Sequence, residues 1–184
     1  MIIVKLGGSL SQSDVLTNCL DRIEAIFVHK SVVIVPGGGA FADQVRLAQQ
    51  RWQFDDITAH RMAILAMQQI ALLIQGLKSH FTIAHSLSEI PKQLLKHRVV
   101  IWSPNIIELD KAAIPASWDI SSDSLAAWLA NTLSAKELIL VKSALIDNRL
   151  NLKQLAELDI IDQGFCSFVE QATFNVKIIN QQDF

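Results

Sequence analysis

The chain has 184 residues, of which 51% are hydrophobic and 18% are charged, and its formal net charge is −2. This length suits one domain with a substantial core, and the composition is far from that of a disordered chain. Because the 16 basic residues are scattered among 18 acidic ones, we expect no nucleic-acid partner.

The cysteines and the N-terminal residues predict a cytoplasmic protein. Cys19 and Cys166 lie far apart, without CxxC spacing or neighbouring histidines, which favours a reducing compartment and no zinc site. The opening residues MIIV run directly into the first glycines and leave no room for a secretory signal. The longest apolar stretch, residues 62–77, is interrupted by two glutamines and is too short for a membrane span, so we expect no membrane association.

Short β-branched runs alternate with helical patterns along the whole chain. The predicted strands are IIVKL, SVVIV, FTIAH, VVIW, ELILV and NVKII (residues 2–6, 31–35, 81–85, 99–102, 137–141 and 175–179). The predicted helices cover residues 13–29, 41–52, 57–77, 91–97, 123–133 and 152–158. Such alternation is typical of an α/β fold with a parallel sheet and helices on both faces. No stretch has the composition of a linker, so we predict a single domain.

Five of the seven glycines directly follow the first two predicted strands. They are Gly7, Gly8, Gly37, Gly38 and Gly39. At the carboxyl end of a parallel strand, glycine N–H groups can point together at an anion, and the next helix adds its positive N-terminus. Lys5 and Ser9 add an ammonium and a hydroxyl group beside the first cluster, which predicts a phosphate site. A tight turn next to a solvated lysine is the alternative.

The second glycine cluster also fits the pattern GxGxxA through Gly37, Gly39 and Ala42, which is typical of dinucleotide-binding proteins. This alternative needs a further strand that ends in an acidic residue about 20 positions later. Asp55 and Asp56 have that spacing, but they precede a helical pattern. The dinucleotide interpretation is therefore weaker than the phosphate interpretation.

Two later stretches carry further candidate residues. The stretch WDISSDSLAAWLA leads into a predicted helix with five residues that can cap it, which are Asp119, Ser121, Ser122, Asp123 and Ser124. One of them is expected to cap the helix, and an aspartate left over could position a lysine or lie behind a metal-bound phosphate. The stretch ELILVKSALID ends a strand in Lys142 and Ser143, where open parallel sheets bind ligands. A solvated lysine is the alternative there.

Taken in order, VKLGGSL, VPGGGAFAD, WDISSDSLAAWLA and ELILVKSALID resemble the amino acid kinase family, which includes acetylglutamate, aspartate, carbamate and uridylate kinases. The resemblance covers nearly the whole chain. It implies a three-layer α/β/α sandwich with a mainly parallel sheet, an acceptor side at about residues 1–115 and a nucleotide side at about 116–184. It also implies transfer of the γ-phosphoryl group of ATP, with Mg²⁺, to an oxygen of a small molecule.

The stretches DITAHRMAILAMQQIALLI and LAELDIIDQGF are also similar to a short branch of the family, the aminomethylfuranmethanol phosphate kinases of methanofuran biosynthesis. This narrower similarity implies that the acceptor is a phosphate monoester on a small aminomethylfuran and that the product is a diphosphate.

The resemblance also implies roles for individual residues. Lys5 would meet the transferring phosphoryl group, Asp123 would organise the catalytic lysines, and Lys142 would begin the nucleotide side. The implied catalytic residues are Lys5, Asp123 and Lys142. The implied ATP-binding residues are Gly7, Gly8, Ser9, Lys142, Ser143 and Asp147. The implied acceptor-binding residues are Gly37, Gly38, Gly39, His60, Arg61 and Ser122. No protein ligand for a metal ion is expected.

His60 and Arg61 each have an ordinary alternative, since a histidine near a helix start can pack or cap and an arginine can be solvated. The chain also departs from the family. Lys142 and Ser143 stand where TD is usual, and no glycine follows Asp147, so adenine recognition lacks its usual residues. The chain is shorter than typical members, which implies that the hairpin lid is lost and that closure depends on a neighbouring subunit.

The apolar helix after His60 favours a homodimer. Three hypotheses for the function follow from the sequence. They are a small-molecule kinase, a catalytically silent kinase-like protein that binds a nucleotide or metabolite, and a dinucleotide-binding oxidoreductase.

Overall fold

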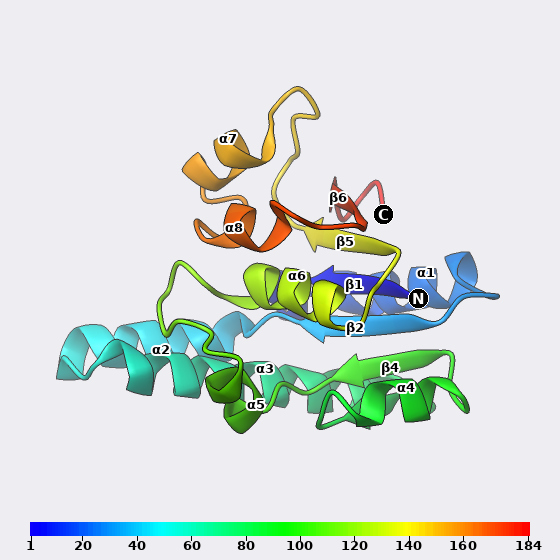
Figure 1. Ribbon diagram of the computed structural model, residues 1–184, viewed down its shortest axis with the longest axis horizontal. Helices are drawn as coiled ribbons and strands as arrows, with labels where there is room; N and C mark the ends of the chain where they lie inside the picture. Colours follow the sequence, from blue (N-terminus) through cyan, green and yellow to red (C-terminus); the bar gives the residue numbers. More distant parts are fainter.

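The structure is a computed structural model that describes all 184 residues, and it contains one parallel β-sheet flanked by helices (Figure 1). The six strands lie in the order β3-β4-β2-β1-β5-β6, and every neighbouring pair is parallel. The strands are β1 (Ile2–Leu6), β2 (Val32–Pro36), β3 (Thr82–Ala84), β4 (Val99–Trp102), β5 (Glu137–Lys142) and β6 (Asn175–Asn180). The strands before the two glycine clusters, β1 and β2, are therefore neighbours at the centre of the sheet.

The helices alternate with the strands as the sequence pattern predicts. They are the 3-10 helix η1 (Gly8–Gln12) and the α-helices α1 (Val15–Ile26), α2 (Gly39–Trp52), α3 (Asp56–Leu77), α4 (Glu89–Leu94), α5 (Ile106–Lys111), α6 (Ser122–Thr132), α7 (Leu152–Glu157) and α8 (Phe165–Val169). The sequence pattern predicts α4 and α7, which have six residues each, but it misses η1, α5 and α8.

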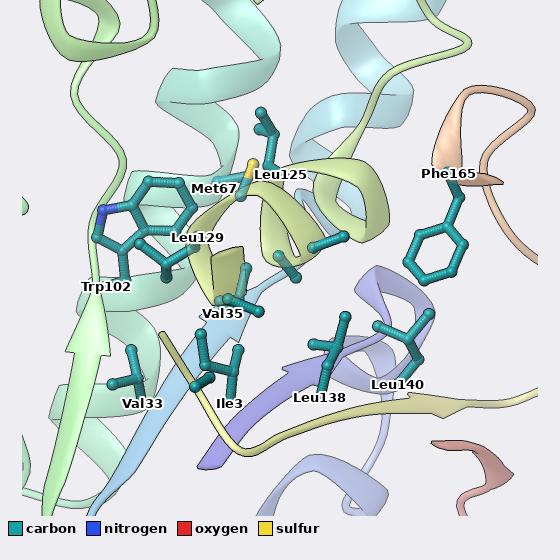
Figure 2. Close-up of a cluster of buried hydrophobic side chains, with 14 of the residues drawn as sticks. Ile3, Val33, Val35, Met67, Trp102, Leu125, Leu129, Leu138, Leu140 and Phe165 are labelled. Atoms are coloured by element: carbon teal, nitrogen blue, oxygen red, sulfur yellow. The ribbon is translucent and has the colours of Figure 1, made fainter. Parts of the chain in front are cut away.

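Alternate residues of each strand point to opposite faces of the sheet, and each face has its own core. On one face, Ile3, Val33 and Leu138 project from the strands toward α6, which contributes Leu125 and Leu129 to the same core (Figure 2). This core of 23 buried residues also includes side chains of α4, α5, α7 and α8. On the other face, a core of 21 buried residues joins the strands to α1 and to the C-terminal half of α3. The predicted three-layer α/β/α architecture is confirmed.

The longest helix, α3, contributes to both cores. Ile64 and Met67 belong to the core under α6, whereas Ile70 and Ile74 belong to the core under α1. Length and composition alone would allow α3 to cross a membrane, since an 18-residue window has a mean hydropathy of 1.4. The core helix of a globular protein passes the same test, and α3 packs against α2 and the sheet in this way.

The fold brings the carboxyl ends of β1, β2 and β5 and the N-termini of η1, α2 and α6 to one edge of the sheet. The chain turns directly from β1 into η1 and from β2 into α2, so both glycine clusters lie at this edge (Figure 1). The N-terminus of α6 also lies there, because Asp123 in its first turn contacts Lys142 at the end of β5. This edge is where open parallel sheets bind ligands.

Candidate active site

The two glycine clusters pack against each other backbone to backbone. A Cβ atom on Gly8 would lie 2.4 Å from the nitrogen of Gly39, and one on Gly37 would lie 2.5 Å from the nitrogen of Gly8. Gly39 also has a φ of +54°, which other residues rarely adopt. The close approach explains why the sequence places glycine at these positions, because any side chain would push the two loops apart.

The glycine N–H groups divide into two kinds. Those of Gly7 and Gly37 donate to the carbonyl oxygens of Val141 and Leu6, each at 2.9 Å, and so extend the sheet. Neither N–H can point at a phosphate. The N–H groups of Gly8, Gly38 and Gly39 have no acceptor within the protein, and these three residues line a cleft. This second set is available to an anionic ligand.

Three charged side chains meet beside these free donors. Asp123 projects from the first turn of α6, and its carboxylate lies 2.6 Å from Nζ of Lys5 and 2.5 Å from Nζ of Lys142. Both contacts are ion pairs, and the Lys142 contact is also a hydrogen bond. Side-chain exposure is only 4% for Lys5, 2% for Asp123 and 13% for Lys142. We call this group the cleft cluster.

The cleft cluster has more positive than negative charge. Burial would raise the pKa of Asp123, but the charges of Lys5 and Lys142 dominate and hold that pKa below its usual value. Burial, together with the positive charge of Lys5, lowers the pKa of Lys142 to about 8. Below that pH, two buried cations share one carboxylate. Such an excess charge is stabilised when an anion binds beside it.

The N-terminus of α6 is held by a residue from a distant loop. Asp162 Oδ2 accepts hydrogen bonds from the main-chain nitrogens of Ser121 (2.8 Å) and Ser124 (2.9 Å), and its Oδ1 accepts one from Ser121 Oγ (2.6 Å). The N–H of Asp162 in turn donates to Asp123 Oδ2 at 3.3 Å. Ser121, which lies in the stretch 119–124, is the N-cap residue of α6, but its side chain makes no capping hydrogen bond. The prediction that a serine or aspartate side chain of this stretch caps the helix is therefore wrong, because Asp162 accepts from the main-chain N–H groups instead.

A cleft of about 590 Å³ opens over the cleft cluster and the free glycine N–H groups. It is lined by nine of the residues that the resemblance implicates, which are Lys5, Gly8, Ser9, Gly38, Gly39, His60, Ser122, Asp123 and Lys142. His60 is half-buried here, and burial lowers its pKa, so it is neutral at pH 7. Its Nε2 is buried without a hydrogen-bond partner.

The other implicated residues lie outside the cleft lining. Arg61 forms an exposed ion pair with Asp110 at 3.0 Å, and Asp147 pairs with Arg149 at 2.7 Å. Ser143 does not line the cleft, but its hydroxyl lies 2.8 Å from that of Ser9, which does. Arg61 and Asp147 already have charged partners, whereas the lysines of the cleft cluster retain an excess of charge.

The cleft also contains residues that the sequence interpretation missed, including Asp162, Arg46 and Trp118. Arg46 could have been found from helical periodicity, since it follows Gly39 by seven residues and so shares its face of α2. Trp118 and Asp162 lie in loops, where no periodic pattern indicates which way a side chain points.

The cleft does not form a metal cage of its own, since no three His, Cys, Asp or Glu side chains are grouped to hold an ion. This donor set fits Mg²⁺ only as an ion that enters on the phosphates of a nucleotide, because Mg²⁺ commonly takes its ligands from phosphates and water. The dinucleotide alternative needs an acidic residue at the end of a strand, but Asp55 and Asp56 both lie at the N-terminus of α3, where Asp55 accepts from the nitrogen of Thr58 at 2.7 Å.

Comparison with known proteins agrees with this geometry. Residues 1–144 match the amino acid kinase family. The chain is 27% identical to the [5-(aminomethyl)furan-3-yl]methyl phosphate kinase of Methanocaldococcus jannaschii, over 98% of this chain and 88% of that protein. The fold is similar to that of uridylate kinase from Archaeoglobus fulgidus, with a TM-score of 0.76 and 18% identity over 99% of this chain and 92% of that one.

A second solved structure, aspartate kinase from Synechocystis, has a TM-score of 0.70 and 13% identity, and the match covers 99% of this chain and 38% of that one. These likenesses confirm the fold, and the family match covers well over half of the chain. The excess of buried positive charge beside free backbone donors suits phosphoryl transfer. On the family match, the protein belongs to the amino acid kinase family and is a small-molecule phosphotransferase.

Proposed function

We propose that the protein transfers the γ-phosphoryl group of ATP, with Mg²⁺, to the phosphate of an aminomethylfuran phosphate in the synthesis of a methanofuran-type cofactor. The observation that carries the proposal is the cleft cluster beside the free N–H groups of Gly8, Gly38 and Gly39. The named activity of the Methanocaldococcus jannaschii relative supports this choice of acceptor.

The chemistry needs positioning and charge neutralisation instead of a covalent nucleophile. An oxygen of the acceptor phosphate attacks the γ-phosphorus, the bond from that phosphorus to the β,γ-bridging oxygen breaks, and ADP leaves. Lys5 and Lys142 stabilise the charge on the transferring group, and Asp123 holds both ammonium groups in place. Mg²⁺, when bound on the nucleotide, neutralises further phosphate charge. The products are ADP and a diphosphate ester.

The direct test is incubation of the purified protein with ATP, Mg²⁺ and [5-(aminomethyl)furan-3-yl]methyl phosphate. We expect mass spectrometry to find ADP and an acceptor that has gained one phosphoryl group. The matching alcohol without its phosphate, incubated in parallel, shows whether the phosphate is the acceptor. Turnover of the alcohol, or no product from either compound, would contradict the proposal.

We also propose that two copies of the chain pair through α3. Leu65 and Leu72 are 47% and 60% exposed and lie seven residues apart, so they share one face of this helix. Leu73 and Leu77 add further exposed apolar surface. A second copy of the same helix offers a matching apolar stripe. We expect light scattering after size exclusion to give twice the chain mass and the variant Leu72→Glu to be monomeric, whereas a monomeric parent protein would overturn this proposal.

A further inference from the structure

Arg46 presents an unpaired positive charge to the cleft. It lies on α2 two helical turns beyond Gly39 and lines the cleft with it. Because Cα–Cβ bonds tilt toward the N-terminus of a helix, its side chain leads back toward the glycine loops. Arg61 and Arg149 have carboxylate partners, but Arg46 forms no ion pair and donates no hydrogen bond within the protein. Its N–H groups are therefore available to a ligand.

The orientation of this guanidinium group is fixed by Trp118. Its central carbon lies 3.8 Å from the centroid of the indole ring, which is a close stacking distance. The indole is held in turn, because Nε1 of Trp118 donates to Oε1 of Gln49 at 2.7 Å. The amide of Gln49 donates to Asp56 Oδ1 at 2.8 Å and to the carbonyl of Phe54 at 3.2 Å. One face of the guanidinium is thus covered, while its edge stays free.

We propose that Arg46, held against Trp118, binds the phosphate of the acceptor and makes the cleft selective for acceptors that already carry a phosphate monoester. This inference rests on the proposed kinase activity, since it concerns the substrate of that reaction. An arginine edge matches two oxygens of one phosphate in a bidentate contact. Arg46 lies on the helix that follows the second glycine cluster, which is the cluster assigned to the acceptor.

Oxygen counting explains why a phosphate suits this site better than a carboxylate. A phosphate monoester has three terminal oxygens, so two can accept from Arg46 and the glycine N–H groups while the third attacks the γ-phosphorus. A carboxylate has two oxygens, so in a bidentate contact with Arg46 the attacking oxygen would also accept from the guanidinium group, which makes it a weaker nucleophile. Arg46 therefore orients the acceptor, whereas Lys5 and Lys142 act on the transferring group.

The test compares Arg46→Gln with Arg51→Gln, a matched control on the same helix. Arg51 stacks on exposed Trp52 at 5.2 Å and does not line the cleft. Calorimetry would measure binding of [5-(aminomethyl)furan-3-yl]methyl phosphate, and kinetics would give KM for the acceptor and for ATP. For Arg46→Gln we expect acceptor affinity to fall about 10- to 100-fold, as for loss of a charge-assisted contact. The KM for ATP should be unchanged, and Arg51→Gln should match the parent protein.

A double-mutant cycle tests the role of Trp118 as a positioning residue. Trp118→Ala should raise the acceptor KM, Trp118→Phe should restore part of the affinity through its ring, and Trp118→Ala combined with Arg46→Gln should be no worse than Arg46→Gln alone. Equal effects of Arg46→Gln on ATP and acceptor, or none on either, would overturn the inference. So would a parent protein that binds no phosphate ester.

Failure of the kinase proposal gives a different pattern of results. If the parent protein binds the phosphate ester through Arg46 but transfers nothing from ATP, the binding assignment stands and the proposed reaction is wrong. If the parent protein phosphorylates an acceptor that lacks a phosphate, the protein is still a kinase, but both the proposed acceptor and the assignment of Arg46 are wrong.

Discussion

Two charge clusters lie at opposite ends of the sheet, and they differ in burial and in the sign of their excess charge. The cleft cluster has two lysines around one aspartate and is almost fully buried. The other cluster, which we call the far cluster, joins α1 to the segment after α3. It consists of Asp21, Glu24, Lys78 and His80.

In the far cluster, Lys78 lies 2.6 Å from Asp21 and 2.5 Å from Glu24, so one lysine serves two carboxylates. Asp21 is 58% exposed and Glu24 29%, which leaves water to solvate the excess negative charge. Hydrogen bonds to these carboxylates raise the pKa of Lys78, whereas burial lowers the pKa of Lys142 to about 8. The same residue types thus form ion pairs that link two segments at one end of the sheet. At the other end they leave a buried excess of positive charge that favours the binding of an anion.

The largest expected effect is the loss of stability in Asp123→Asn. This change leaves Lys5 and Lys142 buried without a counter-ion, and removing one partner of a buried ion pair costs about 3–5 kcal/mol. We expect urea unfolding to show a loss of this size. Asp21→Asn at the far cluster is the control and should change stability little. Equal stability of Asp123→Asn and the parent protein would mean that the excess charge is not in fact desolvated.

Lys5→Met should separate activity from folding. The methionine keeps most of the apolar stem of Lys5, and Asp123 keeps Lys142 as a partner. We expect turnover to fall about 10²- to 10³-fold, the usual result of removing one preorganised charge contact to a transition state. Circular dichroism and thermal unfolding should resemble those of the parent protein. Parent-like turnover by a folded Lys5→Met protein would remove Lys5 from the mechanism.

The sequence predicted the centre of this site better than its surroundings. Lys5 and Lys142 follow from the rule that parallel strands end at one edge, and the glycine clusters follow from their positions after β1 and β2. Sequence could not separate Gly7 and Gly37, whose N–H groups extend the sheet, from Gly8, Gly38 and Gly39, whose N–H groups are free. That difference depends on which strands become neighbours.

Asp162 and Trp118 escaped prediction for a related reason. Asp162 caps α6 across 41 residues of sequence from Ser121, and Trp118 meets Gln49 across 69. Local rules for capping name the nearest serine or aspartate, but Asp162 satisfies those donors once the α7–α8 loop packs against α6. The sequence pattern therefore indicates the chemistry of a site more readily than the residues that hold it in place.

The pH dependence of activity should report the lowered pKa of Lys142. In kcat/KM, which reflects the free enzyme, we expect activity to fall as the pH rises through about 8, because Lys142 loses its proton there. Lys142→Arg should keep its charge and move this limb to higher pH. If the pH profile of the parent protein has no limb near pH 8, and Lys142→Arg gives the same profile, this role of Lys142 is contradicted.

The same ionisation should affect stability with the opposite sign. In the unfolded chain Lys142 keeps its proton up to the ordinary lysine pKa of 10.5, but in the folded chain it does so only up to about 8. Between these values the unfolded state binds more protons, so this group makes the folded state more stable as the pH rises. Urea unfolding at pH 7.5 and pH 9.5, compared between the parent protein and Lys142→Met, isolates this contribution. If raising the pH stabilises the parent protein no more than it stabilises Lys142→Met, this contribution of Lys142 is refuted.

The smallest expected effect is at the far cluster. Lys78→Met should lower the free energy of unfolding by no more than about 1 kcal/mol, because ion pairs that water still reaches contribute little. Turnover should be unchanged, since these residues lie away from the cleft lining. The hydrogen bond with Lys78 lowers the pKa of Glu24 in the folded protein. Its contribution to stability is therefore fully present above the pKa of Glu24 in the unfolded chain, and it is lost as the pH falls through the lowered pKa of the folded protein. The difference between the parent protein and Lys78→Met should therefore shrink in acid, and a difference that instead persists at pH 3 would show that Lys78 acts through packing.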